Sequence, residues 1–253
     1  MDAVKELKAQ AAAAGAERVD LIATSAVRDA SDVLPLTEGL LEETGLKMQI
    51  LSGRQEAVYS FLGAVYPYSG EELTGVMDIG GGSTEIAAGT KEALRVTRSL
   101  QLGASRLYSV KPINDFSSLV PALEGAERVI DSSWRDLPLT PDRWLLVGGT
   151  GTALIGLLRG RQTSSGAGHD EPFTRAEASG MLRRLARLSP QERAALPGMT
   201  PGREHILPTG LAVLTALMTR IDIDSMAVTA RNNTDGYLYA LARKQGEPAS
   251  RDI

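Results

Sequence analysis

Three short strand-like runs, separated by only a few residues each, constrain the fold of this chain more than any other feature. Apolar and β-branched residues dominate residues 74–79, 84–88 and 93–100, and glycine-containing turns separate the runs. Connections this short join antiparallel neighbours, because parallel strands need a long crossover. The sequence therefore predicts an antiparallel meander over residues 74–100.

Strand and helix patterns alternate over the rest of the 253 residues. Strands are expected at 19–24, 48–51, 144–147 and 226–229. Helices are expected at 2–14, 32–44, 55–65, around 115–135, after 152, at 174–188, 203–219 and about 234–244. Residues 159–172 are expected to form an exposed loop. This alternation predicts the α/β class in two lobes. The Pro- and Gly-containing segment 66–70 is the expected linker. It gives a first lobe of residues 1–70 and a second of 71–253, with the C-terminal helix packing back on the first lobe.

Composition excludes several classes of protein. Apolar residues make up 43% of the chain, enough for sizeable cores, and the net charge of −4 argues against a general electrostatic grip on DNA, RNA or an anionic membrane. The absence of cysteine removes disulfides, thiolate catalysis and cysteine zinc sites, and His169 and His205 stand in no metal-binding pattern. Without an apolar run long enough for a membrane helix, the expected location is the cytoplasm.

The turn after the first strand of the meander carries residue types that suit phosphate. A carboxylate ends the strand, three glycines form the turn, and two hydroxyls and a second carboxylate follow: Asp78, Gly80, Gly81, Gly82, Ser83, Thr84 and Glu85. Glycine allows close approach, so that successive N–H groups can point at an anion. The two carboxylates can hold a hard cation such as Mg²⁺. The alternative is a hairpin turn with solvated acids.

A second glycine turn follows the strand at 144–147 and opens a helix. Its residues Gly149, Thr150 and Gly151 are candidate phosphate contacts, because N–H groups at a helix N-terminus favour anions. A purely structural strand-to-helix connection is the alternative. Neither turn matches the Rossmann or Walker pattern.

Two charged side chains elsewhere have two interpretations each. Glu56 comes early in a predicted helix, where it is either a partner of the helix dipole or a catalytic base. Arg28 follows the first strand and could grip phosphate oxygens, or could form a salt bridge with Asp29 or Asp32.

Several motifs in register resemble the exopolyphosphatase and guanosine pentaphosphate phosphatase family, Ppx/GppA. The resemblance rests on residues 23–30 (ATSAVRDA), 50–57 (ILSGRQEA) and 78–85 (DIGGGSTE), supported in the same order by 99–107 and 148–152. It implies two ribonuclease-H-like lobes of the actin, sugar-kinase and Hsp70 superfamily, with the active site in the cleft.

The resemblance also implies an activity. Family members release orthophosphate from the end of inorganic polyphosphate, or from guanosine pentaphosphate, with Mg²⁺ as cofactor. Glu56 matches the family's catalytic glutamate, and would deprotonate water while Arg28 and Mg²⁺ near Asp78 and Glu85 offset charge. A homodimer is expected by resemblance only. The alternatives are a module that binds phosphate, nucleotide or alarmone without turnover and, less well matched, a sugar or acid kinase.

The chain departs from the family pattern at a few places. Gln55 replaces an acidic residue, His205 stands where an aspartate is usual, and residues 232–236 (NNTDG) differ from the family's GLREG-like segment. The chain also starts about where the helix after the family's DxGSNS hairpin would be. The first lobe is therefore expected to lack its opening strands, which would leave an exposed sheet edge at 19–24.

Overall fold

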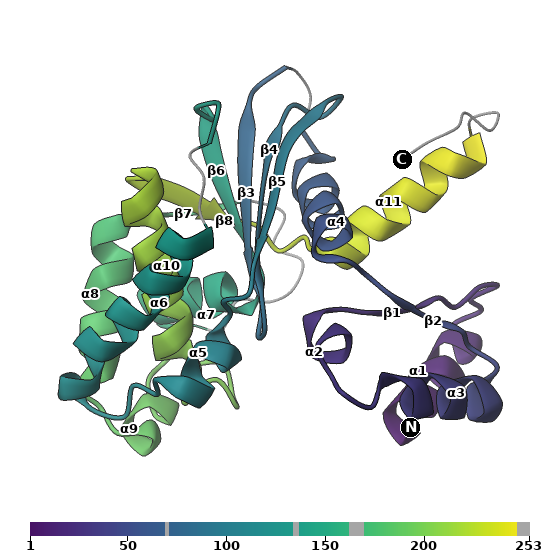
Figure 1. Ribbon diagram of the computed structural model, residues 1–253, viewed down its shortest axis with the longest axis horizontal. Helices are drawn as coiled ribbons and strands as arrows, with labels where there is room; N and C mark the ends of the chain where they lie inside the picture. The colour runs from purple at the N-terminus through teal and green to yellow at the C-terminus, as the bar shows by residue number, and fades with distance from the viewer. Residues whose placement is uncertain (69–70, 134–136, 162–169, 247–253) are drawn as a thin grey trace. The chain divides into compact units, whose positions relative to one another are not determined.

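The chain divides into two compact units, Met1–Gly53 and Arg54–Ile253, in the computed structural model of Figure 1. The structure describes residues 1–68, 71–133, 137–161 and 170–246. The division lies earlier than the predicted linker at 66–70, because the helix that begins at Gly53 buries its apolar residues on the sheet of the second unit. Among the described residues, no helix combines the length and apolarity that crossing a membrane requires.

The N-terminal unit is built on a pair of parallel strands joined by a helical crossover. Its elements are α1 (Asp2–Ala13), β1 (Leu21–Ala23), α2 (Ser25–Arg28), α3 (Val33–Thr44) and β2 (Met48–Ile50). Leu21 pairs with Met48 at the start of the ladder. Lys8 donates a 2.5 Å hydrogen bond to the carbonyl of Thr44, which fastens α1 to the end of α3.

The second unit contains a six-stranded sheet in the order β5-β4-β3-β6-β8-β7. The strands are β3 (Thr74–Ile79), β4 (Thr84–Gly89), β5 (Leu94–Leu100), β6 (Arg143–Val147), β7 (Glu171–Thr174) and β8 (Ser225–Val228). The antiparallel pairing of β3 with β4 and of β4 with β5 confirms the predicted meander. Strands β3, β6 and β8 run parallel, so their carboxyl ends meet at one edge of the sheet.

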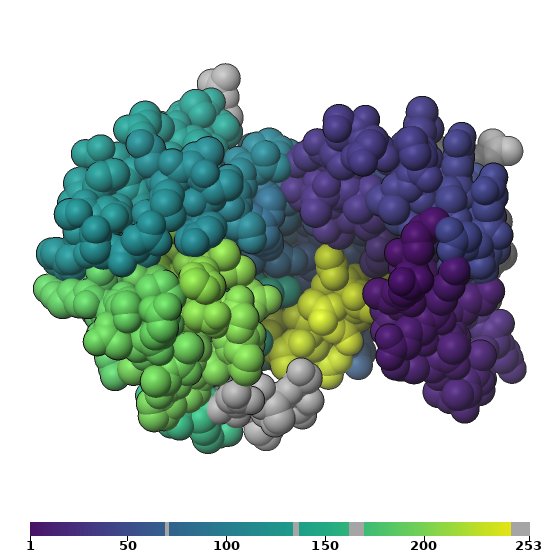
Figure 2. All heavy atoms as spheres, turned by 90° about the horizontal axis from the view of Figure 1, so that it is seen from below, coloured from purple at the N-terminus to yellow at the C-terminus, as the bar shows by residue number. Residues whose placement is uncertain are grey.

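Helices cover both faces of this sheet (Figure 1). One face carries α4 (Gly53–Val65), packed through Ala57 and Phe61 on Val76 and Leu145. The larger core fills the other face, under α5 (Ala104–Val110), a 3-10 turn (Phe116–Ser118), α6 (Leu119–Ser133), α7 (Gly149–Arg159), α8 (Arg175–Ala186), α9 (Pro190–Ala194) and α10 (Leu207–Ile221). Figure 2 shows these helices as closely packed spheres, teal for α5 and α6 and green for α8 and α10.

The last helix, α11 (Asn233–Gly246), packs on α4 through facing glycines. A Cβ atom at Gly236 would overlap the backbone carbonyl of Tyr59, and one at Gly63 would overlap a carbonyl at the start of α11. Tyr59 also meets Tyr237 edge to face, with ring centroids 5.4 Å apart. The C-terminal helix thus contacts α4, which the sequence analysis placed in the first lobe and the structure places in the second unit.

The structure differs from the sequence-based expectation mainly around short elements. Part of the expected exposed loop at 159–172 is instead β7, which pairs antiparallel with β8. The short helices α5 and α9 were not expected either. Residues 162–169, including His169, lie outside the described residues. These elements are fixed by pairing and packing with distant parts of the chain, which leave little local pattern.

Candidate active site

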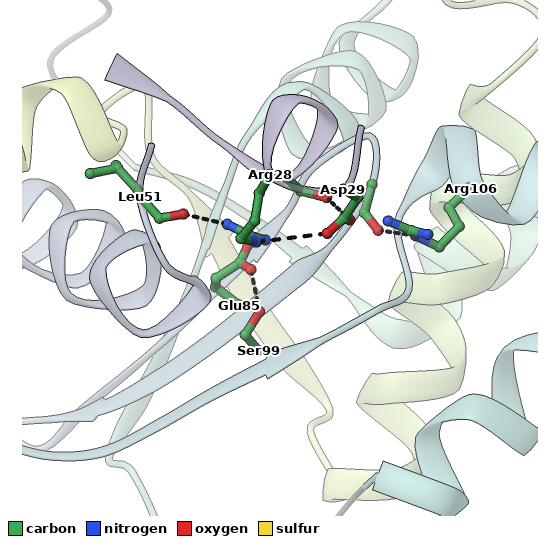
Figure 3. A network of polar contacts seen from close by, with 8 residues as sticks. Arg28, Asp29, Leu51, Glu85, Ser99 and Arg106 are labelled. Atoms are coloured by element: carbon green, nitrogen blue, oxygen red, sulfur yellow. Dashed lines mark hydrogen bonds and ion pairs between the residues drawn. The ribbon is translucent and has the colours of Figure 1, made fainter. Parts of the chain in front are cut away.

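Strand register aligns two carboxylates and a hydroxyl across the meander. Asp78 on β3 lies opposite Glu85 on β4, and Glu85 lies opposite Ser99 on β5. Directly opposed residues project from the same face of a sheet with neighbouring Cβ atoms. Ser99 donates a 2.8 Å hydrogen bond from its hydroxyl to Oε1 of Glu85, as Figure 3 shows. The sheet therefore presents two acids side by side on the face that α4 covers.

Helix α4 adds a third carboxylate to this pair. Ser60 donates a 2.5 Å hydrogen bond from its hydroxyl to Oδ2 of Asp78, which fixes that face of α4 over the acids. Glu56 precedes Ser60 by one helical turn, so both side chains lie on the same face of the helix. Glu56 is 6% exposed and Glu85 is 3% exposed. Three acidic side chains are thus gathered in a site that is largely shielded from water.

The protonation of the site reflects this crowding. Burial, the largest cause, raises the pKa of Glu85 to about 8, and the negative charge of Glu56 adds to the rise. Burial also raises the pKa of Asp78, and the hydrogen bond from Ser60 partly opposes that rise. Like charges in a low-dielectric site resist simultaneous ionisation. Ionisation of one carboxylate in this cluster therefore opposes ionisation of its neighbours.

The glycine turn after β3 is held in place by α5. The carbonyl of Gly80 accepts from the N–H of Ala104 at 2.9 Å, and Arg106 donates from Nε to the carbonyl of Gly82 at 2.6 Å. With the carbonyls engaged by α5, the N–H groups of Gly81 and Gly82 donate no hydrogen bond within the described part of the chain. The turn thus keeps backbone donors for an anion beside the acids.

The two hydroxyls of the predicted phosphate loop have partners inside the protein. The Thr84 hydroxyl donates to the carbonyl of Leu102 at 2.5 Å, and Thr84 is fully buried. The Ser83 hydroxyl lies near the carboxylate of Glu85 and lowers the pKa of that group, against the larger effect of burial. Both side chains are buried, and contact of either hydroxyl with phosphate stays a prediction.

The second glycine turn lies against one of these acids, Asp78. Gly148 has φ of +94°, and a Cβ atom there would lie 2.9 Å from Oδ1 of Asp78. The guanidinium of Arg203 occupies the place where a side chain on Gly149 would start. Thr150 and Gly151 are buried, with Gly151 packed on Leu146 and Val228. This turn therefore joins a carboxylate, a helix N-terminus and an arginine, a combination that suits a phosphate with its counterion.

Sequence reasoning missed three residues of this site: Ser60, Ser99 and Arg203. Ser60 could have been found, because it stands four residues after Glu56 on the same predicted helix. Ser99 required the strand register. Arg203 left no usable signal, because its contact with Gly149 joins segments 54 residues apart that meet only in the folded chain.

Arg28 belongs to the N-terminal unit. There it donates a 2.6 Å hydrogen bond from Nη1 to the carbonyl of Leu51, drawn in Figure 3, and its Nε lies 3.9 Å from Oδ1 of Asp29. The predicted salt bridge to Asp29 is therefore present. A role of Arg28 toward phosphate stays a prediction.

No preformed metal centre is found in the described residues. Three or more acidic or imidazole side chains nowhere come together closely enough to hold an ion by themselves. Mg²⁺ usually takes only one or two carboxylates and completes its shell with water and substrate phosphate. Asp78 and Glu85 fit that smaller requirement.

Solved structures identify the fold. A Ppx/GppA family member from Aquifex aeolicus matches with a TM-score of 0.82 at 22% identity, covering 98% of this chain and 81% of that one. An exopolyphosphatase from Cytophaga hutchinsonii matches with a TM-score of 0.77 at 20% identity, covering 96% and 80%. With the mixed sheet described above, these likenesses define an α/β protein of the actin-like ATPase fold, as the sequence predicted.

Sequence comparison identifies the family. The model of the Ppx/GppA phosphatase family matches residues 1–245. Exopolyphosphatase 2 of Mycobacterium tuberculosis is 31% identical over 244 residues, which span 90% of this chain and 76% of that protein. The chain belongs to the Ppx/GppA phosphatase family, and it is a hydrolase of phosphoric anhydrides. The resemblance inferred from the motifs is confirmed.

Proposed function

We propose that this chain releases terminal orthophosphate from inorganic polyphosphate, with Glu56 as the general base. The observation that carries the proposal is the placement of Glu56 on the face of α4 that covers Asp78 and Glu85, beside the glycine turn of residues 80–83. The relative in M. tuberculosis is named an exopolyphosphatase, which supports polyphosphate as the substrate class.

In the proposed reaction Glu56 accepts a proton from water as the water oxygen bonds to the terminal phosphorus. The bond from that phosphorus to the bridging oxygen breaks, and the products are orthophosphate and a polyphosphate shorter by one unit. N–H groups of Gly81, Gly82 and the first turn of α7, with the guanidinium of Arg203, would bind the phosphate oxygens. Phosphoryl transfer depends mainly on such positioning and electrostatic stabilisation.

Asp78 and Glu85 would hold Mg²⁺ in this scheme. Their raised pKa values and opposed positions suit a divalent cation, since one bound ion would relieve the repulsion between them. When bound, Mg²⁺ would neutralise charge on the phosphate oxygens. Arg28 is proposed as an additional phosphate ligand, supported by its place in the ATSAVRDA motif.

The test is phosphate release from long-chain polyphosphate in the presence of Mg²⁺. Glu56→Gln is expected to lower the rate by about 100-fold or more, because it removes the base. Glu124→Gln is the matched control, because Glu124 is exposed on α6 and pairs only weakly with Arg128. An unchanged rate in Glu56→Gln would contradict the assignment of the base.

The substrate is tested separately by replacing polyphosphate with guanosine pentaphosphate. Faster release from polyphosphate by the wild-type protein supports the proposal. Release from guanosine pentaphosphate alone would assign the other substrate of the family, and binding of either compound without release would identify a regulatory module.

A further inference from the structure

A basic pocket lies on the second unit, apart from the carboxylate cluster. It has a volume of about 420 Å³ and is bounded by α4, by the start of β5 with the turn before it, and by α11. These three elements lie side by side in Figure 1. None of the side chains assigned to the candidate active site lines it. Its size is within the range of ordinary small-molecule sites.

The charge of this pocket is opposite to that of the chain. Four cationic side chains line it, Arg54, Lys91, Arg95 and Arg243, against a single acid, Glu92. The chain as a whole carries a net charge of −4. Four cations from three separate elements give a local excess of positive charge, which attracts an anion carrying more than one negative charge. Arginine in particular pairs with phosphate through two parallel hydrogen bonds.

Between the cations, the lining is apolar. Val58, Leu62, Leu94 and Ala240 are each partly exposed there, and fully buried Phe61 lies beneath them. A chain of phosphates alone would gain nothing from such a floor, since it has no apolar surface to bury. A flat organic ring would be stabilised by burying its apolar face on this floor.

We propose that this pocket binds a nucleotide, with the base on the apolar floor and the phosphates on the arginines. Both halves of the lining then have a partner on one ligand. The pocket shares α4 with Glu56 and Ser60, and β5 with Ser99, so an occupied pocket adds contacts to two of the elements that build the active site.

The test is binding of a fluorescent GDP derivative in metal-free buffer, with displacement by unlabelled GDP or by inorganic tripolyphosphate. The double variant Arg95→Ala/Arg243→Ala is expected to weaken binding by about tenfold or more, because charge-assisted hydrogen bonds are lost. Arg98→Ala is the matched control. Arg98 lies on the same strand in register with Ile86, whose side chain belongs to the opposite face, so its loss should change binding less than twofold.

A second variant tests the apolar floor separately. Ala240→Trp fills the pocket while leaving its charges, and it is expected to weaken GDP binding by about tenfold. In the wild-type protein, GDP should displace the probe at about one tenth of the tripolyphosphate concentration, because only GDP uses the floor.

Three results would overturn the proposal. Equal displacement by tripolyphosphate would show that the site recognises charge alone. Binding that is lost in Arg203→Ala but kept in the double variant would place the nucleotide in the active site. The absence of measurable binding would leave the pocket without this function. Phosphate release from polyphosphate, measured on the same variants, reports on the active site independently and is expected to persist in the Arg95/Arg243 variant.

Discussion

Replacing Glu85 with glutamine should change how the stability of the metal-free protein depends on pH. Glu85 is almost completely buried, and burial followed by the charge of Glu56 raises its pKa from 4.5 to about 8. Since one pKa unit is worth about 1.4 kcal/mol, this difference corresponds to about 5 kcal/mol. This free energy is a large part of the total free energy of unfolding of a typical domain.

The direction of this change in stability follows from whether the folded or the unfolded protein holds the proton of Glu85. Below pH 4.5 the carboxyl is neutral in both states, and above about pH 8 it is ionised in both. Between these values the unfolded chain ionises while the folded protein keeps the proton, so the free energy of unfolding falls as pH rises. Glu85→Gln removes this titration and should be more stable than the wild type by up to about 5 kcal/mol at pH 8.

The measurement is urea unfolding, followed by circular dichroism in EDTA, from pH 5 to pH 8.5 for both proteins. The difference between the two pH profiles cancels the contributions of groups that titrate alike in both proteins. Glu56 and Asp78 are coupled to Glu85, so changes in their titration are part of the measured difference. Added Mg²⁺ should stabilise the wild type at pH 8 more than Glu85→Gln. Parallel pH profiles for the two proteins would refute the reasoning.

Three further substitutions test packing in the second unit. Gly236→Ala should destabilise the protein by about 2 kcal/mol, measured as a lower Tm, because the new Cβ atom would overlap the Tyr59 carbonyl. The control is Gly180→Ala, which should not lower the Tm because Gly180 has open space around it. Gly148→Ala should slow phosphate release with the fold intact by circular dichroism, because its φ of +94° and the nearby Asp78 carboxylate resist a side chain; a normal rate would contradict the packing described. Arg193→Met should cost about 3 kcal/mol in urea unfolding, because the fully buried guanidinium donates to three backbone carbonyls, and an unchanged midpoint would show that these bonds contribute little.

Local sequence pattern was sufficient for much of the second unit. The meander could be predicted because its strands are joined by short turns, and each strand carries its own periodicity. The strand β7 could not, because it contains Pro172 and only four residues, and it exists through pairing with β8. Its place at the edge of the sheet is where a proline is tolerated.

The domain boundary and part of the site depend on tertiary packing in the same way. The apolar stripe of α4 could be predicted from residues 57–65. An apolar stripe does not indicate which sheet the helix packs on, and for this reason α4 was assigned to the first lobe. The acids Asp78 and Glu85 follow from the motif, whereas the neighbours that set their pKa values, Ser60 and Ser99, come from other elements. Arg203 shows most clearly what local sequence pattern cannot predict, because an arginine in a polar segment has many possible partners in the folded chain.

The glycine contact between α4 and α11 has a consequence for how the enzyme is made in the cell. The ribosome produces α11 about 170 residues after α4, which takes roughly 10 to 30 s at ordinary rates of synthesis. During that interval the helix that carries Glu56 lacks its partner. The last strand of the sheet, β8, ends at Val228 just before α11 begins at Asn233, so the sheet and the support of α4 are completed almost together, and we expect activity only after the residues of α11 have emerged.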